Sequence, residues 1–114
     1  MEINEIIKEI NQFRDERNWR QYHNEKDLAI SISLEANELL EIFQWRSSEE
    51  AKEESLEHLK EEIADVLIYT LMLADNLDFD VTDIIREKIV KNGVKYPISQ
   101  AKGSNKKYTE LENN

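Results

Sequence analysis

Residues 62–77 have the sequence Glu-Ile-Ala-Asp-Val-Leu-Ile-Tyr-Thr-Leu-Met-Leu-Ala-Asp-Asn-Leu, and this stretch decides the fold class. From Ile63 to Ala74 it is apolar on nearly every side, which is typical of a helix buried among other helices. Its longest apolar run is about half the length that spans a membrane. The whole chain has only two glycines and one proline, so it has few of the residues that form the tight turns of β-hairpins. We therefore predict an all-α protein.

Apolar residues at helical spacing predict three long helices in addition to the central one. The expected elements run from the N-terminus to about Arg17, from a cap at Asn24 to about Phe43, from about Leu56 to Leu77, and from a cap at Asp80 or Thr82 to a stop at Asn92-Gly93. Ser47 and Glu50 offer a further capping start before the central helix. We predict a four-helix bundle in residues 1–97, followed by a polar tail in residues 98–114 that straps over the domain or a neighbouring subunit.

The net charge of the chain limits the kinds of molecule that it can bind. The chain has 25 acidic and 15 basic side chains, giving a formal net charge of −10, which repels nucleic acid and anionic membrane surfaces. Cysteine is absent, so a disulfide framework and a Cys-based zinc site are excluded. Residues 1–5 carry acids instead of a basic signal-peptide region, and we expect a cytoplasmic location.

Two acids of the second helix occupy positions that solvation does not explain. Glu35 follows Ile32 by three residues and precedes Leu39 by four, so its carboxylate falls near the middle of the apolar stripe. Glu38 lies one turn further on, at the edge of that stripe. Glu41, by contrast, falls toward the polar side, where a surface role suffices.

The central helix repeats this pattern. Glu62, Asp65 and Tyr69 interrupt its apolar surface at a spacing that places all three on one stripe, whereas Glu61 points elsewhere. Clustered buried carboxylates are costly, and neither helix presents a basic residue on the same stripe to neutralise them. A divalent cation is the other remedy, and a set of carboxylate oxygens suits Mg²⁺ or Mn²⁺. The alternative is that the two acidic pairs lie on ordinary solvated helix faces and bind no metal. A di-iron bundle is disfavoured because no glutamate is followed by histidine three residues later.

The two acidic pairs belong to a longer pattern. Glu35-Ala36-Asn37-Glu38 and Glu62-Ile63-Ala64-Asp65 resemble the ExxE…ExxD signature of the MazG-like all-α nucleotide pyrophosphohydrolases. Further likeness to the dCTP-pyrophosphatase branch covers essentially the whole chain. It includes Trp19, His23, Phe43-Gln44-Trp45, Asp65-Val66-Leu67-Ile68-Tyr69, Lys88 with Asn92, Lys95-Tyr96-Pro97, and the tail from Ser104 to Leu111. The chain departs from this branch at Ile10, where animal members have a histidine.

The resemblance implies Mg²⁺-dependent hydrolysis of a nucleoside triphosphate between the α and β phosphates. Carried over by position, the four acids Glu35, Glu38, Glu62 and Asp65 would hold the metal. The residues that would contact substrate are Trp19, His23, Trp45, Tyr69, Lys88, Asn92, Lys95 and Tyr96. From its edge position we predict Glu38 as the residue that activates water. The resemblance further implies a homodimer or homotetramer, in keeping with more apolar surface than one short bundle covers.

The sequence is compatible with three functions. The first is hydrolysis of dCTP or modified dCTP, as a means of cleaning the nucleotide pool. The second keeps the chemistry but acts on dUTP or damaged purine triphosphates. The third is a non-catalytic acidic helical adaptor whose apolar stripes pair with partner helices. An adaptor has no reason to bury Glu35 and Asp65, so their positions in the fold discriminate it from the enzymes.

Overall fold

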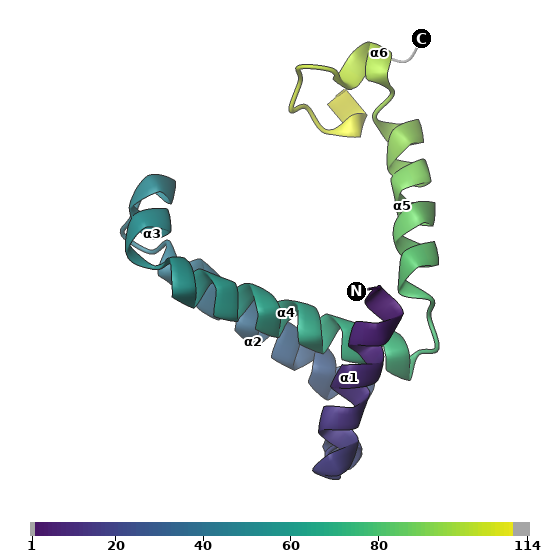
Figure 1. Ribbon diagram of the computed structural model, residues 1–114. Coiled ribbons are helices and arrows are strands. Elements are labelled where there is room, and N and C mark those ends of the chain that lie inside the picture. The colour runs from purple at the N-terminus through teal and green to yellow at the C-terminus, as the bar shows by residue number, and fades with distance from the viewer. Residues whose placement is uncertain (1, 111–114) are drawn as a thin grey trace. The chain divides into compact units, whose positions relative to one another are not determined.

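The computed structural model describes residues 2–110, which form helices and turns with no strand among them (Figure 1). The predicted all-α class is therefore confirmed. The described elements are α1 (Ile3–Glu16), the 3₁₀ helix η1 (Arg20–Tyr22), α2 (Glu25–Ile42), α3 (Ser48–Glu54), α4 (Leu56–Asn76), α5 (Val81–Lys95), α6 (Ile98–Ala101) and the 3₁₀ helix η2 (Tyr108–Glu110). The predicted count of four helices is not confirmed, because short helices α3 and α6 add to the four long ones. None of the described helices combines the length and apolarity needed to cross a membrane.

The chain divides into two compact units, Met1–Phe79 and Asp80–Asn114. The first holds α1 to α4, and the second holds α5, α6 and η2. The boundary expected after residue 97 falls inside the second unit, and the assignment of residues 1–97 to one functional domain stays a prediction. Residues 111–114 of the expected tail lie outside the described residues.

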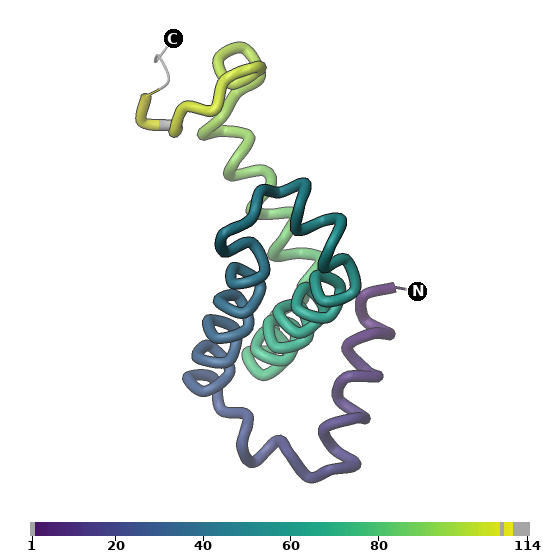
Figure 2. The backbone as a smooth tube through the Cα atoms, turned by 90° about the vertical axis from the view of Figure 1, so that its left-hand side faces the viewer, coloured from purple at the N-terminus to yellow at the C-terminus, as the bar shows by residue number. Residues whose placement is uncertain are grey.

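Helices α2 and α4 are the main packing pair of the first unit. They run side by side in opposite directions, joined at one end by α3 (Figures 1 and 2). Ile42, Ala51 and Leu59 form a buried cluster at this end, with Leu39 and Phe43 packed against it. Helix α1 packs against α4 near the C-terminal end of α4. The pairing of α2 with α4 brings together the two helices that carry the acidic pairs.

Side-chain caps define where the helices begin. Asn24 Oδ1 accepts a hydrogen bond from Asp27 N at 2.9 Å, which satisfies a free N–H of the first turn of α2 as predicted. Ser47 and Glu50 form a complete capping box, but it starts the separate helix α3 instead of leading directly into α4. Of the two caps considered for α5, Asp80 is the one observed.

The predicted helix stop at Asn92-Gly93 is wrong. Helix α5 continues to Lys95, and Tyr96 N donates a hydrogen bond to Asn92 O at 2.8 Å, so the last helical turn passes through Gly93. The glycine that adopts the left-handed conformation is Gly103, with φ of 77°, in the segment after α6. A glycine can end a helix, but it remains compatible with helical backbone where the hydrogen bonds continue.

Candidate functional site

Three of the four predicted acidic ligands converge between α2 and α4. Glu35, Glu62 and Asp65 each offer a carboxylate oxygen, and these oxygens all lie within 4.8 Å of one another. Glu62 is only 8% exposed, and Glu35 and Asp65 are partly buried. Glu38 lies on the exposed side of this group and contacts Glu35, but it is not one of the three that converge. The clustering does not favour a non-catalytic adaptor, since Glu35 and Asp65 are partly buried and lie close together.

The cluster concentrates acidic groups at a partly buried position between the two helices. Glu35 Oε2 and Glu62 Oε2 are buried without a hydrogen-bond partner among residues 2–110. Burial raises the pKa of Glu35 to about 7, and contact with the side chains of Glu38 and Glu62 and the negative charge of Asp65 act in the same direction. Buried unpaired carboxylate oxygens are costly, and a hard divalent cation would satisfy them. The residues present therefore fit Mg²⁺ or Mn²⁺.

A histidine that the sequence reasoning missed contacts this cluster. His58 Nε2 lies 3.4 Å from Glu62 Oε1, one helical turn away on α4. The expectation that no lysine or arginine pairs with these acids is unaffected, and His58 adds a histidine to the stripe of Glu62. The i, i+4 spacing of His58 and Glu62 was the signal that could have revealed it.

A second feature of the site is a largely apolar pocket of about 480 Å³ between α1 and α4. Asp65 belongs to both this pocket and the acidic cluster, so the two adjoin. The walls combine three of the predicted substrate residues with side chains that the sequence reasoning did not select. The lining residues are Ile6, Glu9, Ile10, Phe13, Trp19, His23, Asp65, Ile68, Tyr69 and Met72.

Aromatic contacts shape one wall of this apolar pocket. The Trp19 ring packs edge-on against Phe13, with ring centroids 5.7 Å apart, and against His23 at 6.5 Å. The guanidinium of Arg17 lies over the Phe13 ring at 3.7 Å from its centroid. Burial, followed by the positive charges of Arg14 and Arg20, lowers the pKa of His23. His23 is therefore a neutral ring at pH 7 and can line an apolar pocket without a buried charge.

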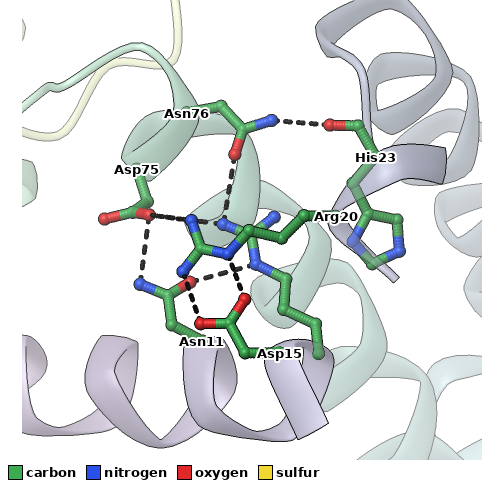
Figure 3. A network of polar contacts seen from close by, with 7 residues as sticks. Asn11, Asp15, Arg20, His23, Asp75 and Asn76 are labelled. Carbon is green, nitrogen blue, oxygen red and sulfur yellow. Dashed lines mark hydrogen bonds and ion pairs between the residues drawn. The ribbon is translucent and has the colours of Figure 1, made fainter. Parts of the chain in front are cut away.

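A buried polar network fixes the loop that carries Trp19 and His23 (Figure 3). Arg14 is fully buried and donates to Asn11 Oδ1, Asp75 Oδ2 and Asn76 Oδ1 at 3.0, 3.3 and 3.1 Å. Asn76 Nδ2 then donates to the backbone oxygen of His23 at 2.6 Å. Arg20, from η1, pairs with Asp15 on the outer side of this network. The loop is thus tied to the C-terminal end of α4.

Tyr69 connects the pocket with the acidic cluster. Burial raises the pKa of its hydroxyl, and the negative charges of Glu35, Asp65 and Glu38 raise it further. The phenol therefore stays protonated and remains a hydrogen-bond donor at the junction of the two features.

The first unit contains one further predicted substrate residue, Trp45, and it does not line this pocket. Trp45 follows α2 with φ of 65° and is 92% exposed. Lys88, Asn92, Lys95 and Tyr96 belong to the second compact unit, which is described by itself, so their substrate role stays a prediction. Lys88 and Asn92 lie one turn apart on α5, and both are exposed.

The raised pKa of Glu35 leads to a pH prediction. The folded metal-free protein holds this proton up to about pH 7, whereas the unfolded chain releases it near the ordinary value of 4.5. The folded state thus binds more protons in this interval, and the contribution of Glu35 to stability falls as pH rises from 4.5 through 7. Because a cation needs the ionised carboxylate, Mg²⁺ binding should strengthen over the same rise, by roughly tenfold between pH 6 and 8.

Isothermal titration of Mg²⁺ at constant ionic strength, in buffers of different ionisation enthalpy, measures both this affinity and the protons released. Glu35→Gln should abolish the proton release, and Glu41→Gln, an exposed acid on the same helix, should retain it. An affinity independent of pH would contradict the assigned role of Glu35.

The MazG-like family model matches residues 30–111, a span that includes both acidic pairs and most of the chain. The chain therefore belongs to the MazG-like family. This finding confirms the family resemblance inferred from the acidic motif.

Individual relatives refine this comparison. The dCTP pyrophosphatase 1 proteins of Rattus norvegicus and Homo sapiens are each 35% identical to the chain over 105 residues. The matches cover 88% of this chain but 62% of each relative, so the chain spans less than two thirds of these curated relatives. A pyrophosphatase from Archaeoglobus fulgidus, known from its crystal structure, is 46% identical in sequence to this chain. The two structures match with a TM-score of 0.78, and the match covers 83% of this chain and 92% of that chain.

Proposed function

We propose that the protein is a nucleotide pyrophosphohydrolase that cleaves a (deoxy)nucleoside triphosphate between the α and β phosphates, in the presence of Mg²⁺ or Mn²⁺. The observation that carries this proposal is the convergence of Glu35, Glu62 and Asp65 beside an aromatic pocket. Relatives named dCTP pyrophosphatase and pyrophosphatase support the same class of reaction. The products are a nucleoside monophosphate and pyrophosphate.

The proposal assigns roles to the acidic residues. Glu35, Glu62 and Asp65 would hold the cation, and Glu38 would complete the set from the exposed side. A bound divalent cation supplies Lewis-acid chemistry, because it withdraws electrons from phosphoryl oxygens and lowers the pKa of an attacking water. Glu38 accepts the proton of that water, since its position at the edge of the cluster leaves it open to solvent and substrate.

The apolar pocket takes the base and sugar. Trp19 and His23 offer ring faces and edges to a nucleobase, and the hydroxyl of Tyr69 faces the junction with the acids. Ile10 is apolar and lines this pocket at the position where animal members carry a histidine. We propose dCTP or modified dCTP as the substrate, and dUTP or damaged purine triphosphates as the alternatives that the same pocket must be tested for. Trp45, Lys88, Asn92, Lys95 and Tyr96 are proposed as further substrate contacts, by family resemblance.

A product analysis tests the function. The protein is incubated with a panel of NTPs and dNTPs, with and without Mg²⁺, and the products are separated by chromatography. Pyrophosphate and monophosphate, abolished by EDTA, are the expected products. Orthophosphate and diphosphate would contradict the proposed cleavage position, and no turnover of any member would contradict the proposed activity.

Glu38→Gln tests the assignment of the base. The variant removes the proton acceptor but keeps the shape, so the turnover number should fall by about 10²-fold or more. Circular dichroism should be unchanged because Glu38 is exposed. Glu25→Gln is the matched control, because Glu25 is an exposed acid on the same helix and lies outside the acidic cluster. Retained activity would remove Glu38 from the role of base.

The proposal includes a homodimer or a dimer of dimers in the cytoplasm, with nucleotide and not nucleic acid or membrane as the partner. It is supported by apolar side chains that stay exposed on both main helices of the first unit. These side chains are Ile30, Leu34 and Leu40 on α2, and Ile63 and Leu67 on α4. Light scattering coupled to size exclusion measures the mass, and a monomer at micromolar concentration would contradict the assembly.

A further inference from the structure

A second, polar pocket of about 400 Å³ lies where α2 ends and α4 begins. It is separate from the apolar pocket, and the two share no lining residue. Three glutamates line it, together with Arg46 and His58, which are the two side chains that can carry a positive charge. The lining residues are Glu38, Glu41, Ile42, Arg46, Ser55, His58 and Glu62.

The acidic cluster lies between this polar pocket and the apolar one. Glu62 lines the polar pocket, Asp65 lines the apolar pocket, and their carboxylates belong to one cluster. On α4, His58 lines the polar pocket and Tyr69 lines the apolar pocket. The two residues lie about three turns apart along the helix, which is roughly 16 Å at a rise of 1.5 Å per residue. An extended nucleoside triphosphate has a comparable length. A substrate with its base in the apolar pocket and its α phosphate at the acids would thus direct its β and γ phosphates into the polar pocket.

Arg46 gives the polar pocket an anchored positive charge. Its Nη1 donates to the backbone oxygen of Ile42 at 2.9 Å, and its Nε lies 3.3 Å from Glu54 Oε2. These two contacts engage two of the five N–H donors of the guanidinium, which keeps its charge at any physiological pH. His58 adds a ring N–H beside Glu62 on the facing helix.

We propose that the polar pocket is the leaving-group site for pyrophosphate, with Arg46 as its principal contact and His58 as a second. This inference rests on the proposed pyrophosphohydrolase function. In that reaction the water oxygen bonds to the α phosphorus, and the bond from this phosphorus to the αβ-bridging oxygen breaks. The electron pair stays on the bridging oxygen and leaves with pyrophosphate, while the water proton goes to Glu38. Because Glu38, Glu41 and Glu62 also line the pocket, a divalent cation would have to accompany pyrophosphate to offset their negative charge.

Product inhibition separates this site from the rest of the active site. Arg46→Gln should raise the inhibition constant for pyrophosphate about tenfold, as expected for loss of a charge-assisted hydrogen bond. The inhibition constant for the monophosphate should stay unchanged, because that product occupies the other side of the acids. Free Mg²⁺ is held constant throughout, since pyrophosphate binds it. Calorimetric titration of Mg²⁺-pyrophosphate into each variant gives a second readout that does not depend on turnover.

Three further variants control for fold and net charge. Lys60→Gln removes an exposed positive charge from α4 outside the pocket and should change neither constant. Glu41→Gln removes a negative charge from the pocket wall and should tighten pyrophosphate binding about twofold. Arg46→Lys should restore part of the affinity lost in Arg46→Gln. Equal pyrophosphate affinity in wild type, Arg46→Gln and Glu41→Gln would overturn the assignment, even in an enzyme that is fully active. Absence of pyrophosphate release from the wild type would instead overturn the proposed function.

Discussion

Glu62→Gln should lower pyrophosphohydrolase activity by at least about a hundredfold and abolish stabilisation by Mg²⁺. Glu62 is the most buried of the converging acids, and its Oε2 has no hydrogen-bond partner among the described residues. The amide keeps the size of the side chain but removes its charge, so the cation loses a ligand while the packing of α4 is retained. The metal-free variant should also be more stable than the metal-free wild type, because one of the causes that raise the pKa of Glu35 is removed.

This opposite pair of effects distinguishes a metal ligand from a structural residue. Thermal unfolding with and without Mg²⁺ should give a higher midpoint for Glu62→Gln without metal and no further rise when metal is added. Glu61→Gln is the matched control, because Glu61 is the exposed neighbour on the same helix. Its Mg²⁺ response and activity should equal those of the wild type. A Glu62→Gln variant that still gains stability from Mg²⁺ and still turns over substrate would exclude Glu62 as a ligand.

The sequence was sufficient to predict which acids face inward, because helical phase depends only on spacing. Glu35, Glu62 and Asp65 interrupt apolar stripes, and two helices with such stripes must bury them against each other. Their convergence follows once α2 and α4 pair. The starts of α2 and α5 were predictable for a similar local reason, since the caps at Asn24 and Asp80 satisfy backbone N–H groups within one turn.

The features that could not be predicted depend on contacts between helices. The apolar pocket requires α1 to lie against α4, which no single helix encodes. The polar pocket depends on the turn that leads Arg46 toward Glu54 and on the separate helix α3. Arg14 is an intermediate case: it occurs four residues after Ile10, on the apolar stripe of α1, and so was a detectable anomaly. Its partners Asp75 and Asn76 come from the far end of α4 and could not be identified from the chain alone.

Arg14→Met should destabilise the protein by about 3 kcal/mol, as expected when one member of a buried ion pair and hydrogen-bond network is removed. Arg14 is fully buried, and its guanidinium donates to Asn11, Asp75 and Asn76. Methionine fills most of the volume but leaves the Asn76 carbonyl oxygen without this donor and weakens the charge compensation of Asp75. Because Asn76 also holds the backbone of His23, the loop at the wall of the apolar pocket should loosen, and KM for the nucleotide should rise.

Urea unfolding monitored by circular dichroism measures the loss of stability, with Lys8→Met as the control for removing an exposed cation from the same helix. The double variant Arg14→Met/Asp75→Leu should be less destabilised than the sum of the two single variants, since it leaves no partly buried Asp75 carboxylate that has lost one of its two cationic partners. Asn76→Ala should raise KM in the same way as Arg14→Met, because it removes the hydrogen bond to His23 directly. If Arg14→Met unfolds at the same urea concentration as the wild type, the network contributes no net stability. If KM is unchanged in both Arg14→Met and Asn76→Ala, the anchored loop does not set the shape of the nucleotide pocket.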